Sequence, residues 1–134
     1  MLRYFLIIIV LTVGLAGCAT TRDEITLNTY KALETSAITY DAVMSAARDM
    51  HVRGQLGDAD WNRLKDKASL YYDAYQTAVE TFATHMKAEE TVAQAGEAEQ
   101  ECLAAAVDVM MVALRALVET AVTLGVEVKE ARNE

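Results

Sequence analysis

The absence of proline most constrains what this chain can fold into, because none of its 134 residues is a proline. Proline is the strongest helix breaker and alanine is the best helix former. Alanine is abundant along the whole sequence. The chain thus lacks the residue that interrupts long helices and is rich in the residue that favours them, so we predict an all-α fold.

Glycine divides the chain into three helical segments. Gly54 and Gly57 flank a short polar break, Gly96 lies in a second break, and Gly125 precedes the C-terminal residues. Glycine is common where helices end, since it adopts the left-handed conformation without strain. The helices expected between these breaks cover residues 23–53, 58–90 and 97–124.

Three long helices with short connections predict an up-down-up antiparallel three-helix bundle. At a rise of about 1.5 Å per residue, helices of roughly 30 residues would be about 45 Å long. The bundle would occupy residues 23–125, and residues 126–134 would form a charged C-terminal tail. Asp58 or Asp60 would be the N-cap of the second helix, because a short carboxylate side chain accepts hydrogen bonds from free backbone amides.

Apolar residues recur at alternating steps of three and four, the spacing of helices that pack lengthwise against each other. The stripe of the first helix consists of Tyr30, Leu33, Ala37, Tyr40, Met44 and Ala47. The stripe of the second consists of Trp61, Leu64, Ala68, Tyr71, Tyr75, Ala78 and Phe82, widened by Tyr72, Val79 and Met86. The wider stripe predicts that the second helix contacts two neighbours.

The third segment is apolar nearly all round, since Asp108 and Arg115 are the strongly polar residues between Cys102 and Val118. Either this helix is central in the bundle, or part of its surface is left for self-association or for a partner helix. That surplus face would consist of Val107, Met111, Leu114 and Val118. Membrane insertion is disfavoured, because each charged side chain would cost about 2.5 to 3.5 kcal/mol at central depth.

The first residues of the chain have the parts of an export signal: Arg3, an apolar run over residues 4–13, and small residues after it. The run ends in the sequence Leu15, Ala16, Gly17 and Cys18. These four residues resemble the lipobox of bacterial lipoproteins, in which the cysteine receives a diacylglyceryl group and the chain is cut before it. The resemblance implies that residues 1–17 are a signal peptide, that Cys18 carries lipid such as palmitate, and that residues 18–22 form a short linker.

The resemblance also implies an address in the cell envelope. In the enterobacterial sorting system, an aspartate after the lipidated cysteine is an inner-membrane retention signal, and this chain has Ala19 there. In a Gram-negative cell we therefore expect anchoring to the periplasmic side of the outer membrane. In a Gram-positive cell the same signal implies the outer face of the cytoplasmic membrane.

Charge and cysteine content limit the partners. The formal net charge is −8, and loss of Arg3 with the signal would make it −9. Such a surface repels nucleic acid, whereas a basic protein partner is compatible with it. The surplus apolar face of the third segment predicts a protein partner or a homo-oligomer. Beside lipidated Cys18, Cys102 is the remaining cysteine. It is either a small buried apolar residue or the site of an intermolecular disulfide in a homodimer.

No set of residues predicts a reaction. His51, His85 and Glu89 lack the Glu-x-x-His pairs that two helices of a di-iron bundle share, so we expect no metal. We expect His85 instead to be half-exposed near a tip of the bundle. The serines lack a base and an acid arranged around a strained turn, so we expect no enzyme and no cofactor beyond the covalent lipid. Four aromatic residues of the second helix could stack on a flat ligand such as a sugar. These residues are Trp61, Tyr71, Tyr72 and Tyr75.

The sequence therefore predicts a membrane-anchored, non-enzymatic lipoprotein that acts as a helical scaffold or interaction module in the cell envelope. The alternative is a periplasmic module that binds a small molecule. Its pocket would lie between the aromatic second helix and the third helix, near Met110 and Met111.

Overall fold

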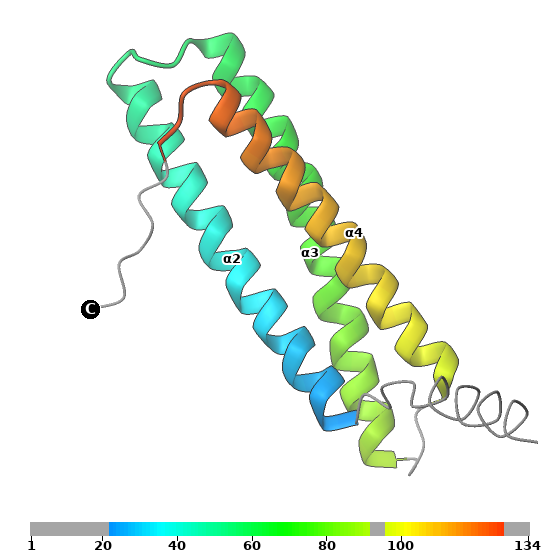
Figure 1. Cartoon of the computed structure of the whole chain (residues 1–134). Coiled ribbons are helices and arrows are strands. Elements are labelled where there is room, and N and C mark those ends of the chain that lie inside the picture. The colour runs from blue at the N-terminus through cyan, green and yellow to red at the C-terminus, as the bar shows by residue number, and fades with distance from the viewer. Residues whose placement is uncertain (1–21, 92–95, 128–134) are drawn as a thin grey trace, which may run out of the picture.

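The computed structural model describes residues 22–91 and 96–127, which form three long helices and no strand. The helices are α2 (Arg22–Val52), α3 (Asp58–Thr91) and α4 (Glu97–Thr123). Each runs antiparallel to the one before it, so the chain passes up, down and up along one rod (Figure 1). The predicted all-α three-helix bundle is confirmed.

Helices α2 and α4 are each followed, two residues after their last residue, by a glycine in the left-handed conformation. Gly54 has φ 72° and Gly125 has φ 77°. After each helix, the chain folds back onto the last turn of that helix. The Gln55 amide donates a hydrogen bond to the Met50 carbonyl oxygen at 2.8 Å. The Val126 amide donates one to the Ala121 carbonyl oxygen at 2.9 Å. Both ends are Schellman motifs, which explains why glycine stops these helices.

The start of α3 differs from the prediction. The helix begins at Asp58, and the Trp61 amide donates to the Gly57 carbonyl oxygen at 2.9 Å, so Gly57 holds the N-cap position. Asp58 and Asp60 both lie inside the first turn. Their carboxylates complement the positive end of the helix dipole there, which is a different stabilising effect from the expected cap.

Val126 also differs from the prediction, which assigned it to a charged tail. It is buried and packs in the same cluster as Leu117 and Ala121 of α4 and Leu56 of the α2–α3 connection. A hydrophobic contact of this kind commonly accompanies a Schellman motif. The bundle therefore extends at least to Val126, and residues 128–134 lie outside the described residues.

Two apolar clusters fill the bundle along its length. One lies toward the α2–α3 connection, and its buried residues are Val43, Ala47, Leu56, Leu64, Ala68, Leu117, Ala121 and Val126. The other lies toward the opposite end, and its buried residues are Leu33, Tyr71, Ala78, Met110 and Leu114. The expected stripes of the first two helices supply six of these thirteen residues, because one face of each helix turns inward.

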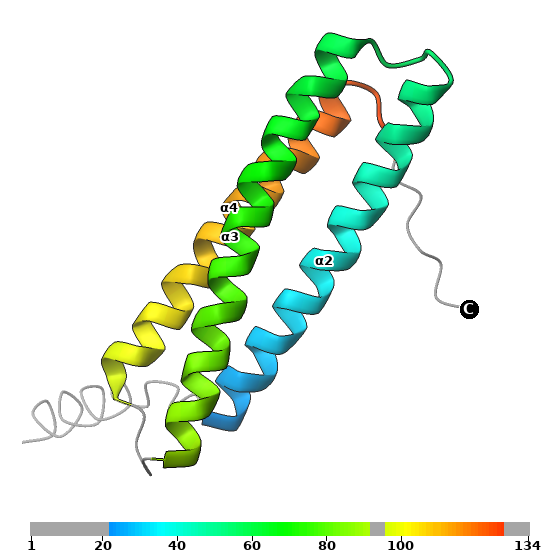
Figure 2. The same ribbon diagram turned by 180° about the vertical axis from the view of Figure 1, so that it is seen from behind.

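Helices α3 and α4 lie closer to each other than either lies to α2, as both views show (Figures 1 and 2). Large rings keep α2 at a distance: Tyr40 of α2 stacks on Tyr71 of α3 with centroids 4.9 Å apart. Small buried residues such as Ala78 of α3 and Ala121 of α4 let the other two backbones approach closely. The bundle is thus a tight α3–α4 pair with α2 on one side.

Candidate functional site: the exposed apolar face of α3 and α4

The surplus face expected on the third helix is mostly covered by the rest of the bundle. Leu114 is only 6% exposed, and Val107 and Val118 pack against the core clusters. Val107 lines a groove with Ile25 and Asn28, which shows that this side of α4 turns toward α2. Met111 is 40% exposed at the edge. The four residues therefore do not form one accessible surface.

The other side of α4 carries apolar residues that no part of the described bundle covers. Val109 is 61% exposed and Val112 is 64% exposed. Cys102 and Ala105 are also exposed, and Ala116 is half-buried. These five residues follow steps of three, four, three and four, which places them in one row along the helix.

Helix α3 contributes a second row beside the first. Leu70 is 59% exposed, Thr77 is exposed, and Ala74 and Thr81 are half-buried. The Thr77 hydroxyl donates to the Asp73 carbonyl oxygen at 3.1 Å, and the Thr81 hydroxyl donates to that of Thr77 at 2.8 Å. Because both hydroxyl groups are hydrogen-bonded to backbone carbonyl oxygens of their own helix, the two threonines add little polarity to the surface.

Two grooves show that the two rows are neighbours. Near one end, Thr81 of α3 and Cys102 of α4 line the same groove. Near the other, Lys67 of α3 and Ala116 of α4 line another. We call the surface between them the α3–α4 face. It consists of Leu70, Ala74, Thr77, Thr81, Cys102, Ala105, Val109, Val112 and Ala116.

The α3–α4 face contains no charged residue, although the chain carries a net charge of −8. The exposed Asp66 and Asp73 border it along α3, and further charges line the grooves at its two ends. Arg63, Lys67 and Glu119 line the groove at the end near the α2–α3 connection. Glu80 and Glu99 line the groove at the other end, which is the end where α2 begins (Figure 1). The face is thus an uncharged strip on an acidic molecule.

The four candidate ligand-binding aromatics mostly pack inside the bundle. Tyr71 is buried between Tyr40 and Tyr75, whose ring centroids lie 4.9 and 5.8 Å from its own. Trp61 stacks on His51, with centroids 5.3 Å apart. Tyr72 alone of the four is exposed. Met110, expected near a pocket, is fully buried in the core. The structure therefore does not bring these residues together as a ligand platform.

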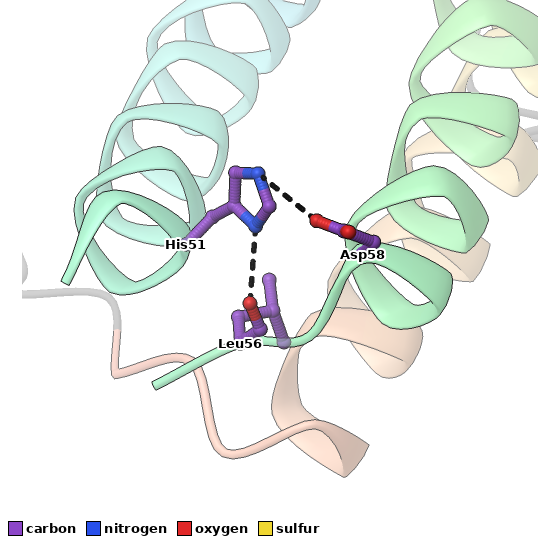
Figure 3. Close-up of polar contacts among 3 residues, drawn as sticks. All are labelled: His51, Leu56 and Asp58. Carbon is purple, nitrogen blue, oxygen red and sulfur yellow. Dashed lines mark hydrogen bonds and ion pairs between the residues drawn. The ribbon is translucent and has the colours of Figure 1, made fainter. Parts of the chain in front are cut away.

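His51 holds the connection between α2 and α3 (Figure 3). Its Nδ1 atom lies 3.0 Å from the Leu56 carbonyl oxygen, which can only accept, so Nδ1 carries the hydrogen. Its Nε2 atom lies 3.8 Å from a carboxylate oxygen of Asp58, whose side chain is almost fully exposed. Together with the Trp61 stack, these contacts give His51 a structural role at the end of the rod.

His85 was expected to be half-exposed near a tip of the bundle, but it is buried on the inner side of α3.

Across residues 22–91 and 96–127, no group of three or more His, Cys, Asp or Glu side chains is arranged to hold a metal ion. Within the same residues, none of the helices is both long and apolar enough to cross a bilayer. The lipobox residues Leu15, Ala16, Gly17 and Cys18 lie outside the described residues.

Comparison with models of known families, with curated proteins and with solved structures gives no match for this chain. The site therefore rests on the geometry of the chain itself. The apolar pattern of the third helix predicted a surplus face, but the residues assigned to it lie on the side that the bundle covers. The signal that could have found it is the uncharged row from Cys102 to Ala116, continued on the second helix by Leu70 and Thr77.

Proposed function

We propose that this chain is a membrane-anchored, non-enzymatic lipoprotein that acts as a helical interaction module in the cell envelope. Lipid on Cys18 anchors it, and the α3–α4 face binds another protein chain. The observation that carries this proposal is the exposure of Val109 and Val112, at 61% and 64%, in the middle of an uncharged strip on an acidic surface. Exposed apolar strips of this kind mark interaction surfaces.

The anchoring half of the proposal rests on the lipobox resemblance and on the position of Cys18. Helix α2 begins at Arg22, so only a few residues separate the lipid from the bundle. Each buried acyl CH₂ contributes about 0.8 kcal/mol, so two or three chains hold a protein at the bilayer durably. The rod would then stay close to the membrane, at the periplasmic side of the outer membrane in a Gram-negative cell.

Metabolic labelling with a palmitate analogue tests the anchor. The full-length chain should take up the label, and Cys18→Ser should not. Cys102→Ser is the matched control, since it removes the other cysteine and should keep the label. Equal labelling of Cys18→Ser and the unchanged chain would contradict lipidation at Cys18.

Photocrosslinking in intact cells tests the interaction surface. A photoreactive amino acid at Val112 should give a discrete crosslinked species, because this residue lies in the α3–α4 face. The same amino acid at Val122 is the control, since both valines are on α4 and both are 64% exposed. Equal crosslinking at the two positions would contradict the proposal that the α3–α4 face is the binding surface.

A further inference from the structure

We infer that the chain seated on the α3–α4 face is a second copy of this protein, in a parallel two-fold dimer. This inference rests on the proposed function and names its partner. In the dimer, α3 of each copy lies beside α4 of the other, and the two α4 helices meet near the axis.

The residue types of the face suit a helix pair from a second copy. Leu70, Val109 and Val112 supply apolar side chains, while Ala105 and Ala116 allow two helices to approach closely. A self-contact in a molecule with a net charge of −8 must avoid like charges. The α3–α4 face is suited to this, because it is uncharged along its middle.

Charges at the border of the face favour the same pairing. Arg63, Lys67 and Glu119 lie at one level of the rod, since they line one groove. Rotation about an axis parallel to the rod keeps this level and places α3 beside α4 of the second copy. Arg63 and Lys67 of one copy then face Glu119 of the other, and the arrangement occurs twice.

The charged ends alone do not distinguish parallel from antiparallel copies. In an antiparallel pair, Arg63 and Lys67 would face Glu80 of the second copy, while Glu119 would lie near Glu99. In the parallel pair, Glu80 and Glu99 of one copy would lie at the same level of the rod as Glu99 and Glu80 of the other copy, and these like charges would repel each other. Each arrangement thus gains one attraction and carries one repulsion.

The anchor decides the orientation. Cys18 precedes α2 by only a few residues, so the end of the rod at which α2 begins must lie close to the bilayer. Two upright copies on one membrane satisfy this condition only when they are parallel. An antiparallel pair would hold one anchor about 45 Å from the other along the rod.

The segments of this chain that lie outside the described residues are poorly suited to bind the α3–α4 face. Residues 128–134 contain four charged residues, which do not suit an uncharged strip. Residues 1–17 are expected to be removed with the signal. A second copy presents the same uncharged strip and is held at the same membrane, which raises its effective concentration.

Cysteine crosslinking of the full-length lipidated chain in native membranes tests the inference. Lipidation blocks the Cys18 thiol, so Cys102 is the reactive cysteine of the mature chain. A short bismaleimide should link two copies through Cys102, giving a band at twice the monomer mass on a denaturing gel. Val109→Glu should lower the linked fraction on the order of tenfold, because it places a charge in the contact. Val122→Glu, on the other side of α4, should leave the fraction unchanged.

Moving the cysteine along α4 tests the orientation. Cys102→Ser with Ala116→Cys places the thiol about 21 Å farther along the rod. In a parallel dimer this variant should also link to itself. In an antiparallel dimer, a thiol at position 116 would lie opposite residue 102 of the second copy. Chains with the thiol at 102 alone, or at 116 alone, would then not link to copies of themselves. Chains of one kind would link to chains of the other kind instead.

Three results would overturn the inference: no link through Cys102, equal linking in Val109→Glu, or links only between the two different variants. Failure of the dimer is distinguishable from failure of the proposed function. A photocrosslink from Val112 to a different protein, without a Cys102 link, would reject the dimer and retain the interaction surface. Loss of both signals would reject both.

Discussion

The Tyr71 hydroxyl donates a hydrogen bond to Ser36 Oγ at 3.0 Å, in the interior between α3 and α2. Ser36 Oγ in turn lies 2.9 Å from the Leu33 carbonyl oxygen, to which it donates, and 3.5 Å from Met110 Sδ of α4. Tyr71, Ser36 and Met110 are all buried. One polar contact thus joins all three helices and fixes how α2 sits against the α3–α4 pair.

Removing either partner of this bond should destabilise the bundle by different amounts. Tyr71→Phe leaves Ser36 with its Leu33 acceptor and should cost about 0.5 to 1.5 kcal/mol. Ser36→Ala leaves a buried phenol hydroxyl without its acceptor and should cost about 1 to 3 kcal/mol. Urea denaturation followed by circular dichroism measures both free energies of unfolding. A smaller loss in Ser36→Ala than in Tyr71→Phe would show that the hydroxyl is satisfied elsewhere.

Alkaline pH should destabilise the bundle through Tyr71. Burial raises the pKa of its phenol above the ordinary value, and the hydrogen bond with Ser36 opposes this rise in part. Because the pKa in the folded state is raised, the stabilisation is complete below the unfolded pKa of about 10 and is lost as pH rises through the folded pKa.

The measurement is the free energy of unfolding between about pH 9 and pH 12, compared in the unchanged chain and in Tyr71→Phe. The unchanged chain should lose more stability over this range than the variant, which lacks the titrating group. Parallel curves would mean that Tyr71 ionises equally easily in the folded and unfolded chain.

Gly125→Ala should destabilise the end of α4. A side chain at φ 77° is strained even though nothing lies within 4 Å of the new Cβ atom, so we expect a loss of about 1 to 2 kcal/mol. Gly96→Ala is the control, because Gly96 has φ −67° and equally open surroundings. Its free energy of unfolding should change less, because the gain of about 0.4 to 1 kcal/mol from a less flexible unfolded chain offsets the poorer N-cap that alanine makes. Equal losses would remove the argument from backbone strain.

Val126→Ala should cost about 1 to 3 kcal/mol, because its side chain is buried among Leu56, Leu117 and Ala121. Val122→Ala, at 64% exposure on the last turns of α4, should have little effect on the free energy of unfolding. Thermal or urea denaturation of the two variants gives the comparison. If Val126→Ala were as mild as Val122→Ala, the residues after α4 would not belong to the folded unit.

The helices were predictable from the sequence because few signals compete in this chain. Without proline, the glycines at 54, 57, 96 and 125 mark where helices begin or end, and the predicted bounds agree with the observed ones within one residue. The N-cap of α3 was predicted wrongly, since a carboxylate in the first turn and one at the cap give the same sequence signal. Asp58 and Asp60 take the first role, and Gly57 takes the second.

The accessible face of α4 was harder to predict for a physical reason. A helix that is apolar nearly all round has several rows with the same three-four spacing, and periodicity alone does not say which row faces α2. The row that includes Leu114 turned inward, and the row that includes Val109 turned outward. The burial of His85 was missed similarly, because its inward position depends on how α3 is rotated against α4.

The reactivity of the Cys102 thiol in intact cells tests directly whether the α3–α4 face is covered by a partner. The rate of its modification by a small maleimide would be compared with that of a thiol at Val122, made by Cys102→Ser with Val122→Cys. Both rates would be normalised to the rate in the denatured chain. If the α3–α4 face is covered in the envelope, Cys102 should react on the order of tenfold more slowly than the thiol at position 122. Equal normalised rates would contradict the claim that this face is a binding surface.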